Sequence, residues 1–164
     1  MATIAGALTA GLLEEFRLPD HEGRAPLRPL YLSAELFDWI DETDELYELD
    51  WSSRTGGRTI AEHLSQTFCD FRCDLRPLVG DLNRVMPTAK GVWKIHSPGL
   101  RVFGWVPGPH SFVAIKAAFV AETHGKNSTT KQMTADVLHF AKENDLLKTI
   151  MTGDRSALFQ TPAK

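Results

Sequence analysis

The sequence predicts an α+β domain: a small twisted antiparallel sheet of about three to four strands, packed against helices and preceded by a helical, acidic N-terminal extension. Three observations predict it. Extended apolar runs separated by turn residues occupy 91–120, amphipathic runs with helical spacing flank them, and Asp and Glu concentrate in residues 1–50. The 164 residues, 43% hydrophobic and 24% charged, suit one globular domain and exclude collagen-like and disordered classes.

The N-terminal part is expected to be mainly helical. A first helix is predicted by apolar residues at every fourth position: Ile4, Leu8, Leu12 and Phe16. Proline and glycine make 18–29 an irregular connector. Residues 30–32 are a candidate short strand, after which Ser33 is expected to cap a helix that runs to about Asp41.

The next helix has a clear start signal. Thr59 and Glu62 have the spacing of a capping box, in which each side chain bonds the backbone N–H of the other residue. The apolar residues that follow fall within one arc of a helical wheel and are predicted to face the core: Ile60, Leu64, Phe68, Phe71 and Leu75. Pro77 is expected to end this helix, and a shorter one is expected over 78–85.

An antiparallel meander is predicted by three runs rich in Val, Ile, Phe and Trp: 91–96, 100–106 and 111–120. Glycine and proline at 97–99 and 107–109 supply the turns. Ser128 or Thr129 is expected to cap a last helix that runs to about Leu147. The chain is therefore divided into an acidic extension over 1–57, an α+β domain over 58–150 and a mobile tail over 151–164.

The charge is distributed unevenly. Residues 1–50 hold 12 acidic and 3 basic side chains, a net charge of −9, whereas residues 51–164 hold 9 acidic and 15 basic ones, a net charge of +6. Eight of the acids lie between Glu35 and Asp50. Such a block suggests charge complementarity, within the chain or towards a partner; a plain solvated face is the alternative.

No metal, cofactor or membrane is expected. Cys69 and Cys73 lie one helical turn apart, but no second ligand pair has the spacing of a zinc site, so reduced thiols are predicted. The sequence contains no glycine-rich phosphate loop and no apolar run that could span a membrane. The apolar N-terminus lacks the basic start of a signal peptide, so we expect a cytoplasmic protein.

Basic side chains follow the predicted sheet and its exit. Lys94 and His96 are expected on one face of the first meander strand, and Arg101 begins the second. Four more basic residues follow along the third strand and beyond it: Lys116, His124, Lys126 and Lys131. Basic groups suit contact with phosphate and stabilise the charge that develops when a phosphodiester is cleaved. The alternative is a set of solubilising side chains on an exposed face.

The stretch GVWKIHSPGLRVFGWV (91–106), followed by FVAIKAAF (112–119) and a helix, resembles the RelE/HigB toxin superfamily, particularly its phage-derived HigB-like members. The shared features are an aromatic-containing strand that ends in a basic residue, a tight turn, a strand that starts Arg-Val and an apolar strand that ends in Phe. The resemblance covers about residues 58–147. It implies a small twisted sheet with helices on one face, and ribosome-dependent mRNA cleavage in which a 2′-hydroxyl attacks the adjacent phosphate.

The resemblance also implies roles for single residues. Arg101 matches the family's basic residue on the central strand and would stabilise the phosphate, while His96, often Arg in relatives, is a base or a mere substitution; Lys94 completes the expected catalytic set. RNA binding is expected from Lys116, His124, Lys126 and Lys131. The implied partners are the ribosome with its mRNA and a cognate antitoxin. The catalytic set is incomplete, because Ala121 and Glu122 stand where the family usually has two lysines, and its C-terminal Tyr or His has no counterpart.

A non-enzymatic function is the alternative interpretation. The acidic face would imitate nucleic-acid phosphates and block a basic surface on a host nucleic-acid enzyme or defence complex, as a phage-type inhibitor does. Its partner-binding residues would be Asp38, Asp41, Glu42, Asp44, Glu45 and Glu48. A third interpretation is a subunit of a larger assembly anchored by Trp39 and Trp51.

Overall fold

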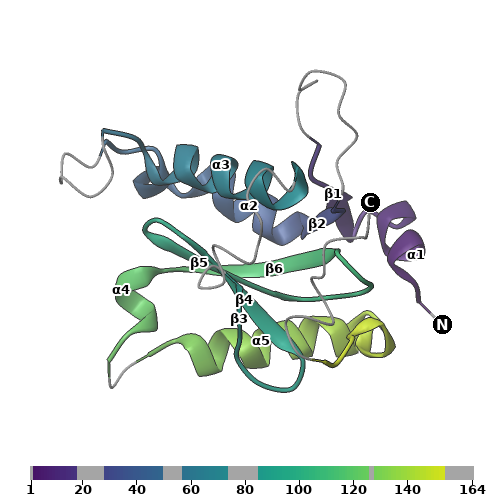
Figure 1. Ribbon diagram of the computed structural model, residues 1–164. Helices are drawn as coiled ribbons and strands as arrows, with labels where there is room; N and C mark the ends of the chain where they lie inside the picture. The colour runs from purple at the N-terminus through teal and green to yellow at the C-terminus, as the bar shows by residue number, and fades with distance from the viewer. Residues whose placement is uncertain (1, 18–27, 50–56, 74–84, 126–127, 154–164) are drawn as a thin grey trace.

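The computed structural model describes residues 2–17, 28–49, 57–73, 85–125 and 128–153. They form one sheet covered by helices (Figure 1). The strands are β1 (Leu13–Glu15), β2 (Leu30–Ser33), β3 (Val85–Pro87), β4 (Val92–Ser97), β5 (Leu100–Trp105) and β6 (Phe112–Phe119). The helices are α1 (Ile4–Thr9), α2 (Ala34–Glu42), α3 (Ile60–Cys73), α4 (Val120–Thr123) and α5 (Thr130–Glu143), with 3₁₀ turns η1 (Asp44–Leu46) and η2 (Leu147–Thr149).

The α+β class is confirmed, but the sheet is larger than predicted and mixed. Its six strands lie in the order β1-β2-β6-β5-β4-β3. The predicted meander is present as β4, β5 and β6, which pair antiparallel. The prediction of three to four antiparallel strands is wrong, because β2 pairs parallel to β6 and β1 adds a further edge strand. Strands of three or four residues leave almost no periodic signal in the sequence.

Helices cover both faces of the sheet, not one face as the family resemblance implied. Helices α2 and α3 lie on one side, and α5 lies on the other (Figure 1). The first face buries one core around Leu36, Phe68 and Ile95. The second face buries another around Trp105 and Val137. The sheet therefore separates two cores, and alternate residues of its strands point into each.

The segment predicted as an extension takes part in this architecture. Its two strands, β1 and β2, belong to the same sheet as the meander. The predicted first helix is shorter than expected: α1 ends at Thr9, and Leu12 and Phe16 lie outside it. Gly11, with φ +72°, adopts the left-handed conformation that terminates a helix and turns the chain into β1.

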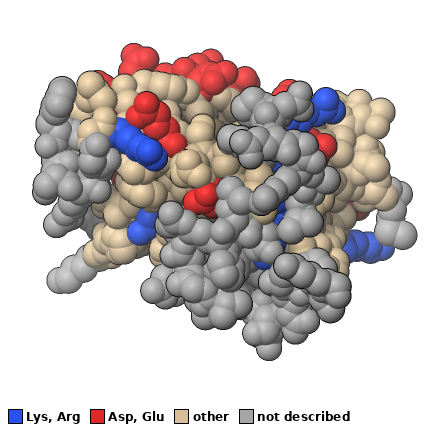
Figure 2. Space-filling view, turned by 45° about the horizontal axis from the view of Figure 1, so that its top comes forward, with Lys and Arg blue, Asp and Glu red and all other residues tan. Residues whose placement is uncertain are grey.

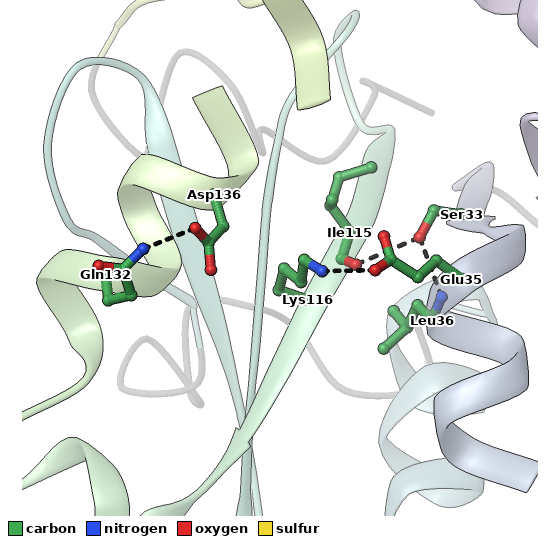
Figure 3. A network of polar contacts seen from close by, with 7 residues as sticks. All are labelled: Ser33, Glu35, Leu36, Ile115, Lys116, Gln132 and Asp136. Atoms are coloured by element: carbon green, nitrogen blue, oxygen red, sulfur yellow. Dashed lines mark hydrogen bonds and ion pairs between the residues drawn. The ribbon is translucent and has the colours of Figure 1, made fainter. Parts of the chain in front are cut away.

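The predicted helix caps at Ser33 and Thr59 are confirmed, whereas Thr129 precedes α5 without a capping bond from its side chain. The Ser33 hydroxyl accepts a hydrogen bond from Leu36 N at 3.1 Å and donates one to the carbonyl of Ile115 at 3.2 Å, which joins the start of α2 to β6 (Figure 3). Thr59 N donates to Glu62 at 2.7 Å, and Glu62 N donates to the Thr59 hydroxyl at 3.1 Å. These side chains satisfy backbone N–H groups that a helix start leaves free.

The core-facing stripe of α3 is also confirmed where the structure describes it. Leu64, Phe68 and Phe71 are buried and Ile60 is half-buried, whereas Leu75 and Pro77 lie outside the described residues. The helix predicted over 78–85 lies outside them too, except that Val85 belongs to β3. The last predicted helix is present as α5, which begins after Thr129. Of the predicted tail, Met151 donates its N–H to the carbonyl of Val106, and residues from 154 on lie outside the described part.

A β-bulge between β5 and β6 fixes the register of the central pair. Phe103 lies opposite Lys116 and Gly104 lies opposite Ala114, so that Ile115 has no partner. A Cβ atom at Gly104 would lie only 1.7 Å from the carbonyl oxygen of Val113. The bulge therefore requires glycine because of close backbone approach.

We expect Gly104→Ala to lower the free energy of unfolding by at least about 3 kcal/mol, since the obstructing atom is backbone and cannot rotate away. Gly108→Ala is the matched control, because its Cβ would meet the Ser111 hydroxyl at an ordinary 3.5 Å. Urea unfolding of both variants measures the difference. Equal stabilities of the two variants would contradict the close approach at the bulge.

Candidate functional site

Three of the predicted basic residues meet on one face of the sheet. His96 of β4 lies directly opposite Arg101 of β5, and Lys94 lies two residues before His96. Their neighbours Ile95 and Val102 point into the core beneath α2 and α3. Lys94, His96 and Arg101, hereafter the basic trio, therefore lie on the opposite face, the one covered by α5.

His96 is held as a neutral imidazole at neutral pH. Its pKa is lowered from 6.5 to about 4, first by burial and then by the positive charges of Arg101, Lys94 and His124. Its Nε2 atom is buried and has no hydrogen-bond partner among the described residues. A neutral imidazole next to fixed positive charges has the protonation state of a general base.

Arg101 is fixed to the turn between β4 and β5. Its Nη1 donates to the carbonyl oxygens of Ser97 at 3.0 Å and of Leu100 at 2.9 Å. Its Nε is buried without a hydrogen-bond partner among the described residues. Two fixed bonds orient the guanidinium, while the Nε–H remains as a donor for a bound group.

The basic trio carries positive charge without a local counterion. Burial lowers the pKa of Arg101, and burial followed by the charge of Arg101 lowers the pKa of Lys94. Neither side chain forms an ion pair with a carboxylate of the described residues. Like charges that share a half-buried place repel each other, so a bound anion would stabilise the arrangement.

The other predicted RNA-binding residues are dispersed. His124 follows α4, is exposed and lies close enough to lower the pKa of His96. Lys131 lies in the first turn of α5 and lines a cavity that Lys94 also lines. Lys116 is held instead by Glu35 of α2, at 2.9 Å (Figure 3), and Lys126 lies outside the described residues.

Lys90, which no sequence pattern identified, lines the same cavity as Lys94 and Lys131. The only local signal was its position at the turn before β4, where it has φ +52° next to Gly91. Three lysines from a turn, a strand and a helix meet there only through the fold.

The predicted acidic face is exposed. Asp and Glu side chains form a band along the upper edge of the view in Figure 2, which brings the α2 and α3 layer forward. All six predicted partner-binding residues are exposed: Asp38, Asp41, Glu42, Asp44, Glu45 and Glu48. In the described part of the chain none of them forms an ion pair, in contrast to Glu35. Trp39 packs against the ring of Phe119 with centroids 6.0 Å apart, and Trp51 lies outside the described residues.

Within the described ranges, no group of three His, Cys, Asp or Glu side chains is placed to hold a metal ion. Cys69 and Cys73 are half-buried free thiols on α3, and burial raises the pKa of Cys69. None of the helices described is long and apolar enough to cross a membrane.

Comparisons with family models, with curated proteins and with solved structures found no match to this chain. The arrangement of its own residues must therefore carry any functional conclusion.

The lowered pKa of His96 predicts a pH dependence of folding. In the unfolded chain His96 binds a proton below about pH 6.5, whereas in the folded protein it does so only near pH 4. Stability from this residue is therefore complete above pH 6.5 and is lost as the pH falls towards 4, by about 1 kcal/mol after solvent screening of a half-exposed group.

Two measurements check this. Urea unfolding at pH 7.5 and 4.5 measures how far the free energy of unfolding falls in acid. This fall should be smaller in His96→Gln than in the wild type. NMR titration should give the His96 ring a midpoint near pH 4. A midpoint near 6.5 would contradict the half-buried, positively charged environment.

Proposed function

We propose that this chain is an mRNA endoribonuclease of the RelE/HigB toxin type. The observation that carries the proposal is the pairing of a neutral imidazole, His96, with a fixed guanidinium, Arg101, on one sheet face. Lys94 extends the same face by one more cation. This combination of a base and two cations suits cleavage of a phosphodiester next to a free 2′-hydroxyl.

In the proposed reaction His96 accepts the proton of the 2′-hydroxyl as its oxygen attacks the adjacent phosphorus. The new P–O2′ bond forms while the P–O5′ bond breaks, which yields a 2′,3′-cyclic phosphate. Arg101 Nε–H and the Lys94 ammonium stabilise the charge on the non-bridging oxygens. The leaving 5′-oxygen takes a proton from Lys94, whose lowered pKa makes its ammonium a better acid.

The proposed partners are the ribosome with its mRNA, and an antitoxin that would have to cover the basic trio. The lysine pair that relatives place after the last strand is missing in this chain, where Ala121 and Glu122 belong to α4 instead. In the described part of the chain, the next lysine after β6 is Lys131, in the first turn of α5. The proposal therefore assigns phosphate binding to α5 rather than to the end of β6.

We expect His96→Ala and Arg101→Ala each to reduce mRNA cleavage at least about a hundredfold, since each removes a group that acts on the reacting atoms. Cleavage is measured on a defined mRNA in a translating extract, with the product ends tested for cyclic phosphate. Lys142→Ala, an exposed lysine near the end of α5, is the control and should keep full activity. Intact mRNA with the wild type, or equal cleavage by all four proteins, would refute the proposal.

A second candidate function rests on the acidic face. Asp41 and Glu42 lie in the last turn of α2, which contains no basic residue. Negative charge there opposes the helix dipole, so the stability of α2 does not explain these residues. A solvent-exposed carboxylate cluster of this kind would imitate a nucleic-acid backbone for a basic host protein.

If the face binds such a protein, exchanging Asp41 and Glu42 for Lys should abolish the complex while the fold is retained, because both side chains are exposed and Lys suits the helix end. The matched control is the exchange of the exposed Glu14 and Glu143 for Lys, which changes the charge equally. Affinity capture from the host in 50 and 300 mM salt, with RNA as competitor, provides the measurement. Capture that is unaffected by the first exchange would exclude the acidic face.

A further inference from the structure

A cavity of about 600 Å³ opens between the turn before β4 and the first half of α5. Its lining holds three lysines from separate elements: Lys90, Lys94 and Lys131. Hydroxyl groups of Ser128 and Thr130 stand beside them, and Ala135 and Leu138 give an apolar part. Ligand pockets of small molecules have this size, with a mostly apolar lining and a few polar groups.

The cavity wall is held by bonds within the protein. The Thr134 hydroxyl donates to the carbonyl of Thr130 at 2.8 Å and lies 3.0 Å from the Thr88 hydroxyl, which ties α5 to the turn that carries Lys90. The Ser128 hydroxyl accepts from Thr130 N at 3.3 Å. Hydrogen bonds within the protein therefore hold the start of α5 against the turn before β4, the two elements that carry Lys131 and Lys90.

The charged side chains that line this cavity are all positive. No carboxylate is among its lining residues in the described part of the chain. The first turn of α5 contains Lys131 but no acidic residue, and the Thr129 side chain makes no capping bond. The positive end of the helix dipole therefore adds to the charge of three ammonium groups. A bound anion would offset the repulsion between these positive charges.

We propose that this cavity is a nucleotide subsite for single-stranded RNA, in which Lys90 and Lys131 hold a phosphate and the base lies against Leu138. The inference rests on the proposed function and deepens it. Lys94 lines the cavity and also belongs to the basic trio, two residues from His96 on the same sheet face. A nucleotide bound in the cavity would therefore place the next phosphodiester of the strand beside His96 and Arg101.

The test uses a short RNA with every 2′-hydroxyl methylated, which binds but is not cleaved. The double variant Lys90→Gln/Lys131→Gln should bind this RNA about tenfold more weakly, and its slope of log affinity against log salt should fall by about 0.7 for the one phosphate contact that is lost. The matched control is Lys142→Gln/Lys148→Gln, which removes two exposed charges from the other end of α5 and from η2. Its affinity should stay within twofold of the wild type. Fluorescence anisotropy measures all three.

The outcomes separate this inference from the proposed function. Equal binding by the two double variants, or no binding by the wild type, would overturn the subsite. A nucleoside 5′-monophosphate that binds as tightly as the RNA would overturn the assignment to a strand. If the wild type binds the methylated RNA in this way but leaves natural mRNA intact, the subsite stands and the nuclease fails. If Lys90→Gln/Lys131→Gln cleaves with an unchanged KM, the nuclease stands and the subsite fails.

Discussion

The parallel pairing of β2 with β6 is the contact on which the rest of the architecture depends. It joins residues 30–32 to residues 112–114, the longest connection in the sheet. Ser33 strengthens it, because its buried hydroxyl caps α2 and donates to the carbonyl of Ile115 in β6. The ion pair of Glu35 with Lys116 continues this link at the surface (Figure 3). One edge of β6 thus determines where the N-terminal third of the chain lies and which sheet face α2 covers.

That placement gives the two sheet faces different chemistry. Helix α2 brings the exposed carboxylates to one side of the molecule, while β4, β5 and α5 gather the basic trio and the lysine cavity on the other. Among the described residues, the exposed carboxylates of α2 and the three lysines of the cavity thus lie on opposite sides of the sheet. An anionic ligand is attracted to the basic face and is repelled by the acidic one, so the two surfaces are suited to different partners.

How far the sequence predicted these features depends on the range of each signal. The caps at Ser33 and Thr59 and the meander were predicted correctly, because each signal lies within a few neighbouring residues. The short strand over 30–32 was predicted too, but its parallel pairing with β6 and the second helical layer were not, because pairing between distant segments leaves no local pattern. The four-residue repeat that begins at Ile4 was misinterpreted, since Gly11 ends the helix although the periodicity continues. In the site, strand alternation placed Lys94 and His96 together, but only the fold brings Lys90 to Lys131.

The Nε atom of Arg101, which does not take part in the bonds to the turn carbonyls, favours a role beyond structure. If the guanidinium served only to hold this turn, its other nitrogen atoms would be expected to contact water or a hydrogen-bond partner. Buried polar atoms without partners cost about 1–3 kcal/mol each. Here Arg101 Nε and His96 Nε2 are both buried without partners in the described structure, on residues that face each other across two strands. Two apolar side chains at these positions would cost less free energy to bury and would not be repelled by the charge of Lys94. In the proposed function these two residues are the ones that meet the RNA: the Nε–H of Arg101 donates to the phosphate, and His96 accepts the proton of the 2′-hydroxyl.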